Sequence, residues 1–242
     1  VALGLCLIKQ NKNTGAMNIK LVIFDFDNTL YHGKLFALRL VLSNLRRALW
    51  AKAERKARKL LAGKDYANGT DLHAALFDEM SKILGTEPKA IKDWYETKYL
   101  NSMVSILNKH YAARPLAKET IDKLLKSGIK VAVLSDYGLT DRRLEAIGLA
   151  DDRIGKWSTE DMGALKPAAR TFAEVAQANR ATPQETLVIG DRADTDGAGA
   201  KNAEMSCWLI DGKKAMNSMG IETLTWEEIC TRLGNMAERK RT

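Results

Sequence analysis

Two aspartates stand two residues apart at the end of an apolar run, in the stretch KLVIFDFDNTL at 20–30. Side chains alternate faces along a strand, but the chain bends where a strand ends, so Asp25 and Asp27 can both reach the crevice beyond it. Two carboxylates this close repel each other unless a cation or a proton relieves them. The pair therefore predicts a cation site at the carboxyl end of the first strand.

Further polar side chains follow where later apolar runs end or where a helix is expected to begin. They are Ser135, Asp136, Lys166, Asp191, Asp194 and Asp196. The strands of a parallel sheet share one carboxyl edge, so these groups are expected to meet the first pair in one crevice. Carboxylates in such numbers suit Mg²⁺, which also keeps waters and a phosphate oxygen among its ligands. Asp194 is expected to cap a helix or to lie at the surface instead of binding metal.

Taken together and in this order, these features resemble the four motifs of the haloacid dehalogenase (HAD) superfamily of phosphohydrolases. The resemblance rests on DFDNTL at 25–30, the serine after the second strand, the Lys-Pro pair at 166–167 and GDRADTD at 190–196. It covers the expected core, about 18–34 and 113–212. It implies the HAD fold and a phosphoryl-transfer reaction that depends mainly on positioning and charge.

The resemblance also implies a role for each motif residue. Asp25 would be the nucleophile that forms an aspartyl-phosphate, and Asp27 would protonate the leaving oxygen and later activate water. Ser135 and Lys166 would bind the phosphoryl group. Asp196 would bind the metal directly or through water, and Asp27 would bind through its backbone carbonyl. The implied Mg²⁺ ligands are Asp25, Asp27, Asp191 and Asp196.

Asn28 and Glu204 stand where Gly is common in the family; the first is a known variation within the pattern and the second lies away from the chemistry, so neither changes the expected reaction. The acid at Asp27 favours phosphate esters over carbon–halogen or carbon–phosphorus bonds. We therefore expect Mg²⁺-dependent hydrolysis of a small phosphorylated metabolite. The sequence leaves two alternatives open: a phosphomutase that uses the same aspartate pair, and a catalytically weak binding or regulatory protein with a basic helix.

The elements that must position these residues alternate between short apolar runs and helical patterns. Strands are expected at 21–24, 129–134, 187–189 and 205–210, with a shorter one at 154–157, and helices at 116–127, 167–180, 196–203 and 226–233. This alternation predicts an α/β fold with a Rossmann-like parallel sheet. We assign 18–34 and 113–242 to the core domain, 35–112 to an all-helical cap domain, and 1–17 to a leader or N-terminal arm.

The expected cap begins with a basic amphipathic pattern and continues with helices at 72–84, 89–99 and 100–111. Apolar residues at three-to-four spacing predict one long helix that buries this stripe: Leu38, Val41, Leu42, Leu45, Leu49, Ala53 and Leu60. From Arg39 to Lys64 there are nine Lys or Arg and one acid. This basic face could be simply solvated or could steer anionic substrates, and nucleic acid is disfavoured because the stretch contains no recognised binding motif.

Composition sets the remaining limits. The chain has 242 residues, of which 45% are hydrophobic and 28% charged, so it can build a packed core. Three cysteines without a C-x-x-C pair fit a reducing cytoplasm, and VALGLCLI at 1–8 is too short to span a bilayer, so no membrane is expected. The three histidines show no metal-ligand spacing, and Trp50, Trp94 and Tyr95 are expected to pack inside the cap.

Overall fold

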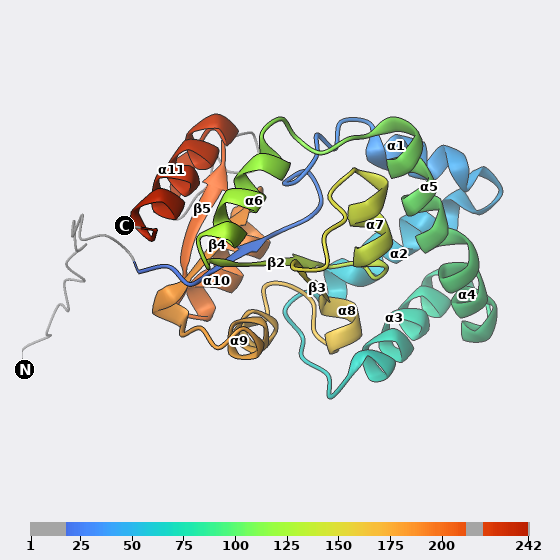
Figure 1. The fold of residues 1–242 in the computed structure, drawn as a ribbon. Helices are drawn as coiled ribbons and strands as arrows, with labels where there is room; N and C mark the ends of the chain where they lie inside the picture. Colours follow the sequence, from blue (N-terminus) through green and yellow to red (C-terminus); the bar gives the residue numbers. More distant parts are fainter. Residues whose placement is uncertain (1–17, 212–219, 242) are drawn as a thin grey trace, which may run out of the picture.

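One parallel sheet of six strands organises the protein, whose computed structural model describes residues 18–211 and 220–241 (Figure 1). The strand order is β3-β2-β1-β4-β5-β6, and every neighbouring pair is parallel. The strands are β1 (Leu21–Phe24), β2 (Lys130–Ser135), β3 (Gly155–Ser158), β4 (Thr186–Gly190), β5 (Ser206–Ile210) and β6 (Glu222–Leu224). The expected α/β fold with a Rossmann-like sheet is therefore confirmed. The sequence missed only β6 among these strands.

Helices connect and cover the strands. Those between β1 and β2 are α1 (Phe36–Ser43), η1 (Leu45–Arg47), α2 (Ala48–Leu61), α3 (Gly69–Leu84), α4 (Pro88–Trp94), η2 (Tyr95–Tyr99), α5 (Leu100–His110) and α6 (Ala117–Lys126). Those after β2 are α7 (Thr140–Ala146), α8 (Thr159–Met162), α9 (Ala169–Ala178), η3 (Pro183–Glu185), η4 (Ala193–Gly197), α10 (Ala198–Asn202) and α11 (Trp226–Arg239). No helix in the described ranges is both long enough and apolar enough to cross a membrane.

The sheet is covered on both faces, and its central strand shows how. All four residues of β1 are buried, which is typical of a parallel strand between two helical layers. Val22 and Phe24 belong to the apolar cluster that includes α6 and α11, whereas Leu21 and Ile23 belong to the cluster that includes α9. The alternation of side chains along β1 thus connects two core layers and fixes the direction in which its last residue leaves the sheet.

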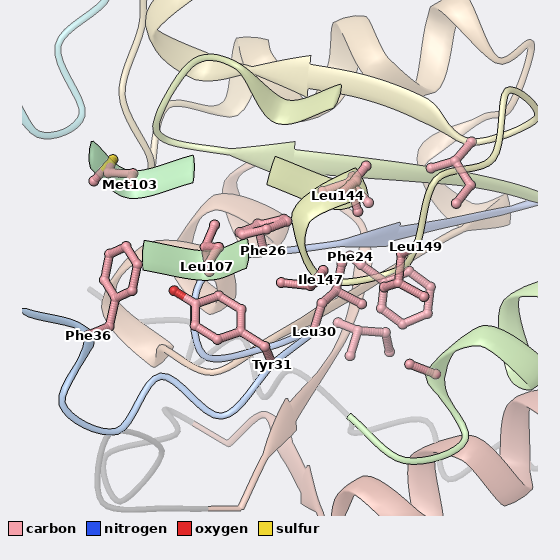
Figure 2. Packing of buried hydrophobic residues seen from close by; sticks show 14 of the residues in the cluster. Phe24, Phe26, Leu30, Tyr31, Phe36, Met103, Leu107, Leu144, Ile147 and Leu149 are labelled. Atoms are coloured by element: carbon pink, nitrogen blue, oxygen red, sulfur yellow. The ribbon is translucent and has the colours of Figure 1, made fainter. Parts of the chain in front are cut away.

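The apolar core continues from the sheet into the helical insertion. Figure 2 shows Phe26 and Tyr31, which follow β1, packed beside Phe36 of α1 and Leu107 of α5. The rings of Tyr31 and Phe36 meet edge to face with their centroids 5.9 Å apart. The insertion therefore packs directly over the carboxyl end of β1 instead of forming a separate apolar unit.

The prediction of one long helix at the start of the insertion is wrong. The chain forms α1, turns at Asn44 through η1, and then forms α2. Most of the predicted buried stripe is also wrong: Ala53 is buried, but Leu38, Leu42, Leu45, Leu49 and Leu60 are exposed. Periodicity alone could not detect this, since the buried face of α2 includes charged residues whose partners lie elsewhere in the fold.

Other elements differ from expectation mainly in their boundaries. The predicted helices at 89–99 and 100–111 form one continuous run, since the π-helical segment η2 connects α4 to α5. Both α7 and α8 were missed, and α11 extends six residues beyond its predicted end at 233. The expected leader at 1–17 lies outside the described residues.

Candidate active site

The candidate site lies where the chain leaves the carboxyl ends of β1 and β4. These strands pair in register, with Phe24 opposite Ile189, so the acids that follow each strand come close together. Gly190 is the last residue of β4 and directly precedes Asp191. A Cβ at Gly190 would lie 2.4 Å from the Cβ of Asp196, so only glycine allows Asp196 to approach. Strand pairing and one glycine thus bring the two acidic motifs to one place.

Three carboxylates and one ammonium form the centre of the site. One carboxylate oxygen from each of Asp25, Asp191 and Asp196 lies within 4.8 Å of the others. Lys166 Nζ donates to Asp25 Oδ1 at 2.7 Å and to Asp196 Oδ1 at 2.8 Å. Four residues that the sequence placed in one crevice are therefore brought together.

Burial and mutual repulsion set the electrostatics of this cluster. Burial, together with the charge of Asp196, raises the pKa of Asp25 to about 7 against the pull of Lys166. Burial also raises the pKa of Asp196, although Lys166 opposes the shift. Burial disfavours the charged form of Lys166, but the carboxylates of Asp196 and Asp25 outweigh it and raise the pKa of Lys166. The site has a surplus of negative charge that one lysine does not neutralise.

The turn after β1 orients two of these acids. Thr29 Oγ1 donates to Asp25 Oδ2 at 2.8 Å, and Asn28 Nδ2 donates to Asp191 Oδ2 at 2.8 Å. Asn28 has a φ of 62°, in the left-handed region, and Glu204 has a φ of 58°. Both positions that depart from the family pattern thus have the backbone geometry that favours glycine, and Asn tolerates it better than most residues.

Two donors that the sequence did not indicate hold Asp27. Tyr31 Oη donates to Asp27 Oδ1 at 2.7 Å, and Arg143 Nη2 donates to Asp27 Oδ2 at 2.6 Å. Arg143 is fully buried, and its guanidinium lies over the Phe26 ring at 4.3 Å. Because Arg143 is on α7, a helix that no sequence pattern predicted, no local pattern linked it to Asp27.

Ser135 lies beside the site in a fully buried position. Its Oγ accepts from Arg143 Nη1 at 2.7 Å and from the Tyr137 backbone N–H at 3.1 Å. Arg143 therefore joins the expected phosphate-binding hydroxyl to Asp27. Ser135 does not line the cavity that opens in front of Asp25 and Asp27.

A cavity of about 490 Å³ opens in front of Asp25 and Asp27. Its walls include Asp136 and Tyr137 from the loop after β2 and three cations of α2. These cations are Arg55, Arg58 and Lys59. The cavity therefore combines acids on the sheet side with positive charge on the insertion side.

Arg58 connects the insertion to the core. Its guanidinium pairs with Glu54 on the same helix and with Glu160 of α8, and it donates to the Asp136 backbone carbonyl at 3.0 Å. It also lies over the Tyr137 ring at 4.0 Å. The basic pattern from Arg39 to Lys64 predicted that Arg58 lies on an outer face with the other cations, and this prediction is wrong because Arg58 is buried.

Other groups lie away from this centre. Asp194 is a surface acid whose Oδ1 accepts from Arg192 Nε at 2.9 Å, as expected for a residue outside the metal cluster. His73 approaches Glu160 to 3.7 Å and forms a small cluster with Glu160 and Asp161. The Glu160 carboxylate already pairs with Arg58 and accepts hydrogen bonds from Tyr95 Oη and the Gly138 N–H, so little of its negative charge is left to bind a cation.

The central donor set fits a hard divalent cation. Its carboxylates are converging oxygens, and a single ammonium, that of Lys166, is hydrogen-bonded to both Asp25 and Asp196. Mg²⁺ prefers oxygen ligands of this kind and needs only one or two carboxylates. Asp27 contributes no carboxylate to the cluster, because both of its side-chain oxygens are directed to Tyr31 and Arg143.

The sequence from residue 19 to residue 204 matches the family model of haloacid dehalogenase-like hydrolases. Among curated proteins, the chain is 25% identical over 205 residues to a glyceraldehyde 3-phosphate phosphatase of Methanopyrus kandleri, covering 77% of this chain and 82% of that protein. It is 28% identical over 211 residues to the protein of the same name from Methanocaldococcus jannaschii, covering 81% and 86%. It is also 28% identical over 124 residues to a ribulose-1,5-bisphosphate 5-phosphatase of Halopiger xanaduensis, covering 50% and 48%.

Solved structures agree in fold. CbbY from Rhodobacter sphaeroides, crystallised with xylulose-(1,5)bisphosphate, superposes with a TM-score of 0.63 at 17% identity, covering 85% of this chain and 93% of that chain. A 2-haloacid dehalogenase from Pseudomonas syringae superposes with a TM-score of 0.62 at 19% identity, covering 91% and 99%. At these identities the matches show a shared fold.

Proposed function

Because the chain belongs to the haloacid dehalogenase-like hydrolase family, we propose that it is a Mg²⁺-dependent phosphatase that hydrolyses small phosphate monoesters through an aspartyl-phosphate at Asp25. The observation that carries this proposal is the convergence of Asp25, Asp191 and Asp196 around Lys166 at the carboxyl edge of the sheet. The phosphatase activity named for curated relatives supports the reaction class.

In the first half-reaction, the Asp25 carboxylate attacks phosphorus, so that an Asp25 oxygen–phosphorus bond forms while the ester oxygen–phosphorus bond breaks. Lys166 and Thr29, which bind the two Asp25 oxygens, fix the direction of attack. The leaving oxygen takes a proton from Asp27, which lines the same cavity. The nucleophile and the acid thus come from one strand end, two residues apart.

In the second half-reaction, Asp27 accepts a proton from the water that attacks the aspartyl-phosphate. The phosphorus–Asp25 bond then breaks, inorganic phosphate leaves, and the Asp25 carboxylate is restored. Tyr31 and Arg143 hold the two Asp27 oxygens, so they orient this acid and base group in both steps. Without that support, a carboxylate that is about one third exposed would sample several rotamers.

Mg²⁺ would be held by Asp25, Asp191 and Asp196, with the Asp27 backbone carbonyl as the further protein ligand implied by the motif. When bound, it would supply positive charge that stabilises the transferring phosphoryl group and favours ionised Asp25. Asp196 would act directly or through water, since it also binds Lys166. Ser135 would contribute to phosphate binding only if its hydroxyl turned from Arg143 toward the cavity.

The substrate we propose is a small phosphorylated metabolite. A cavity of about 490 Å³ suits a molecule of that size, and Arg55 and Lys59 on its wall suit an anionic or strongly polar one. The curated relatives named for glyceraldehyde 3-phosphate and ribulose-1,5-bisphosphate indicate suitable test compounds. We also propose a reducing, cytoplasmic location, which suits the free thiols of Cys207 and Cys230.

The proposal is tested by phosphate release from those two compounds and from p-nitrophenyl phosphate, with Mg²⁺ or with EDTA. We expect Asp25→Asn to lower turnover by at least about 10³-fold, because an amide is a poor nucleophile. Asp194→Asn is the matched control, since Asp194 is an exposed acid three residues after Asp191. Substantial turnover by Asp25→Asn, or full activity in EDTA, would contradict the proposal. Dependence on a bisphosphorylated activator would indicate a phosphomutase.

A further inference from the structure

Five leucines form an exposed surface on the helical insertion, which we call the leucine face. They are Leu35, Leu38, Leu42, Leu45 and Leu49, each between 51% and 69% exposed. They recur every three or four residues, from the start of α1 through η1 to the start of α2. Helix α1 is thereby apolar on two sides, since Phe36 and Leu40 are buried on its inner side. A helix that is apolar all round normally has both sides covered.

The leucine face lies at an outer edge of the molecule. Figure 1 shows α1 running outward and α2 returning beside it, on the side of the molecule opposite α11. The active-site cavity uses Phe36, Ala37 and Leu40 of α1, and none of the five leucines lines it. The leucine face is therefore separate from the site proposed above.

Unpaired cations surround this apolar surface. The stretch from Lys34 to Lys64 contains a single acid, Glu54, which is fully buried and paired with Arg58. Throughout residues 18–211 and 220–241, no acid forms an ion pair with the exposed cations of this stretch, which include Arg46, Lys52 and Lys56. Arg55, Arg58 and Lys59 of this stretch line the active-site cavity, so the exposed cations that remain for the leucine face are those such as Arg46, Lys52 and Lys56.

Several lysines on other surface helices behave differently. Lys82, Lys89 and Lys123 each pair with an acid on the neighbouring turn of the same helix. Such pairs are the usual pattern for a solvated helix surface. Exposed cations without an ion pair also occur elsewhere in the described residues, for example Lys109 and Lys118, so what distinguishes this surface is that such cations lie beside exposed leucines.

We propose that the leucine face and its surrounding cations bind the surface of an anionic phospholipid bilayer. Leucines would enter the boundary between headgroups and acyl chains, while the flexible Arg and Lys side chains reach the lipid phosphates. The interruption at Asn44 separates the leucines of α1 from those of η1 and α2, so the pattern gives no straight seam for a partner helix. A second copy of the chain is disfavoured, because a two-fold contact would place Arg46 and Lys52 against the same cations.

The proposal is tested by co-sedimenting the full chain with phosphatidylcholine vesicles that contain or lack phosphatidylserine, at low and high salt. We expect binding only to the anionic vesicles and weaker binding as salt rises. The double variant Leu38→Gln and Leu42→Gln should bind at least about tenfold more weakly, because it removes apolar surface and keeps helix propensity. Lys52→Gln with Lys56→Gln should also weaken binding and reduce its salt dependence.

Two matched controls separate this effect from general changes in charge and hydrophobicity. Ile83→Gln removes an exposed apolar side chain of α3, and Lys89→Gln removes an exposed cation of α4, and both should bind like the parent. The variants should keep the parent's melting temperature and its p-nitrophenyl phosphate turnover. For the parent itself, anionic vesicles should protect backbone amides at 35–49 from hydrogen exchange.

Failure of the parent to bind anionic vesicles at low salt would overturn the proposal. Equal binding by the parent and the double leucine variant would also overturn it, as would concentration-dependent dimerisation that the double leucine variant abolishes. An acidic protein that binds the parent in place of vesicles would identify the other class of partner and likewise refute membrane binding.

Discussion

Replacing Asp25 with Asn is expected to stabilise the metal-free protein at neutral pH while it destroys activity. The pKa of Asp25 is raised from 3.8 to about 7 by burial and by the charge of Asp196. Between these values the unfolded chain releases the Asp25 proton and the native protein keeps it, so the stability of the native protein falls as pH rises. An amide carries no proton to lose and avoids this penalty.

The size of the effect follows from the width of that window. About three pH units at about 1.36 kcal/mol per unit give an upper bound of about 4 kcal/mol for a single buried group. Asp196 is shifted in the same direction and repels Asp25, so removing one charge should also relieve the other. The stability of Asp25→Asn relative to the parent should therefore rise by about 2–4 kcal/mol between pH 4 and pH 7.

The assay is urea unfolding in EDTA at several pH values between 4 and 7.5. Other groups also titrate, and some act in the opposite direction, because the carboxylates of Asp151 and Glu160 have pKa values lowered to about 2. Subtracting the free energy of unfolding of the variant from that of the parent at each pH removes these shared contributions. Asp194→Asn should follow the parent throughout, since it is an exposed acid outside the buried cluster.

The same reasoning predicts how Mg²⁺ acts on the parent. A cation that binds only the native protein at 100 times its dissociation constant should add about 2.7 kcal/mol. That stabilisation should grow as pH rises toward 7, because protons and Mg²⁺ compete for Asp25. If the difference in free energy of unfolding between the parent and Asp25→Asn did not change with pH, the raised pKa of Asp25 would be refuted.

Three further substitutions test the support of the site. Lys166→Met should destabilise the protein by about 3–5 kcal/mol and lower kcat at least about 100-fold, because it leaves Asp25 and Asp196 without their shared cation. Urea unfolding and phosphate release would measure these effects, and a kcat like that of the parent would contradict the prediction. Arg143→Met should lower kcat more than it changes KM, since Asp27 loses one of its two donors, with partial recovery in Arg143→Lys; a change in KM alone would refute this. Gly190→Ala should lower the free energy of unfolding by about 1–3 kcal/mol and weaken Mg²⁺ binding, because the new Cβ displaces Asp196. Gly234→Ala is the control and should have neither effect, since a Cβ there meets nothing within 4 Å. Equal metal titrations for the two variants would contradict the steric argument.

The sequence by itself predicted five of the six strands, and it predicted that the acids and the lysine would meet at the carboxyl edge of the sheet. Apolar runs short enough for strands ended in Asp25 and Asp191, and parallel strands must bring such ends to one edge. Lys166 was found because it lies in a short motif before a helix. These features are encoded within a few residues of one another, so pattern and spacing suffice to predict them.

Only the tertiary structure decided what supports and surrounds that centre. Arg143, Tyr31 and Arg58 act on residues that are distant in sequence or on another element, and no local pattern contains those pairs. The burial of Arg58 illustrates the physical reason, since a charge can be buried only where partners such as Glu160 are supplied by the fold.

The orientation of the insertion was decided in the same way. The leucine pattern from Leu38 to Leu49 satisfied the rule for a buried stripe, yet the structure buries the other side of α1 and α2. Periodicity reports that one face of a helix is apolar, but it does not say which of two apolar faces meets the core. That choice was made by Phe36 and Leu40, which pack against residues beside the active site.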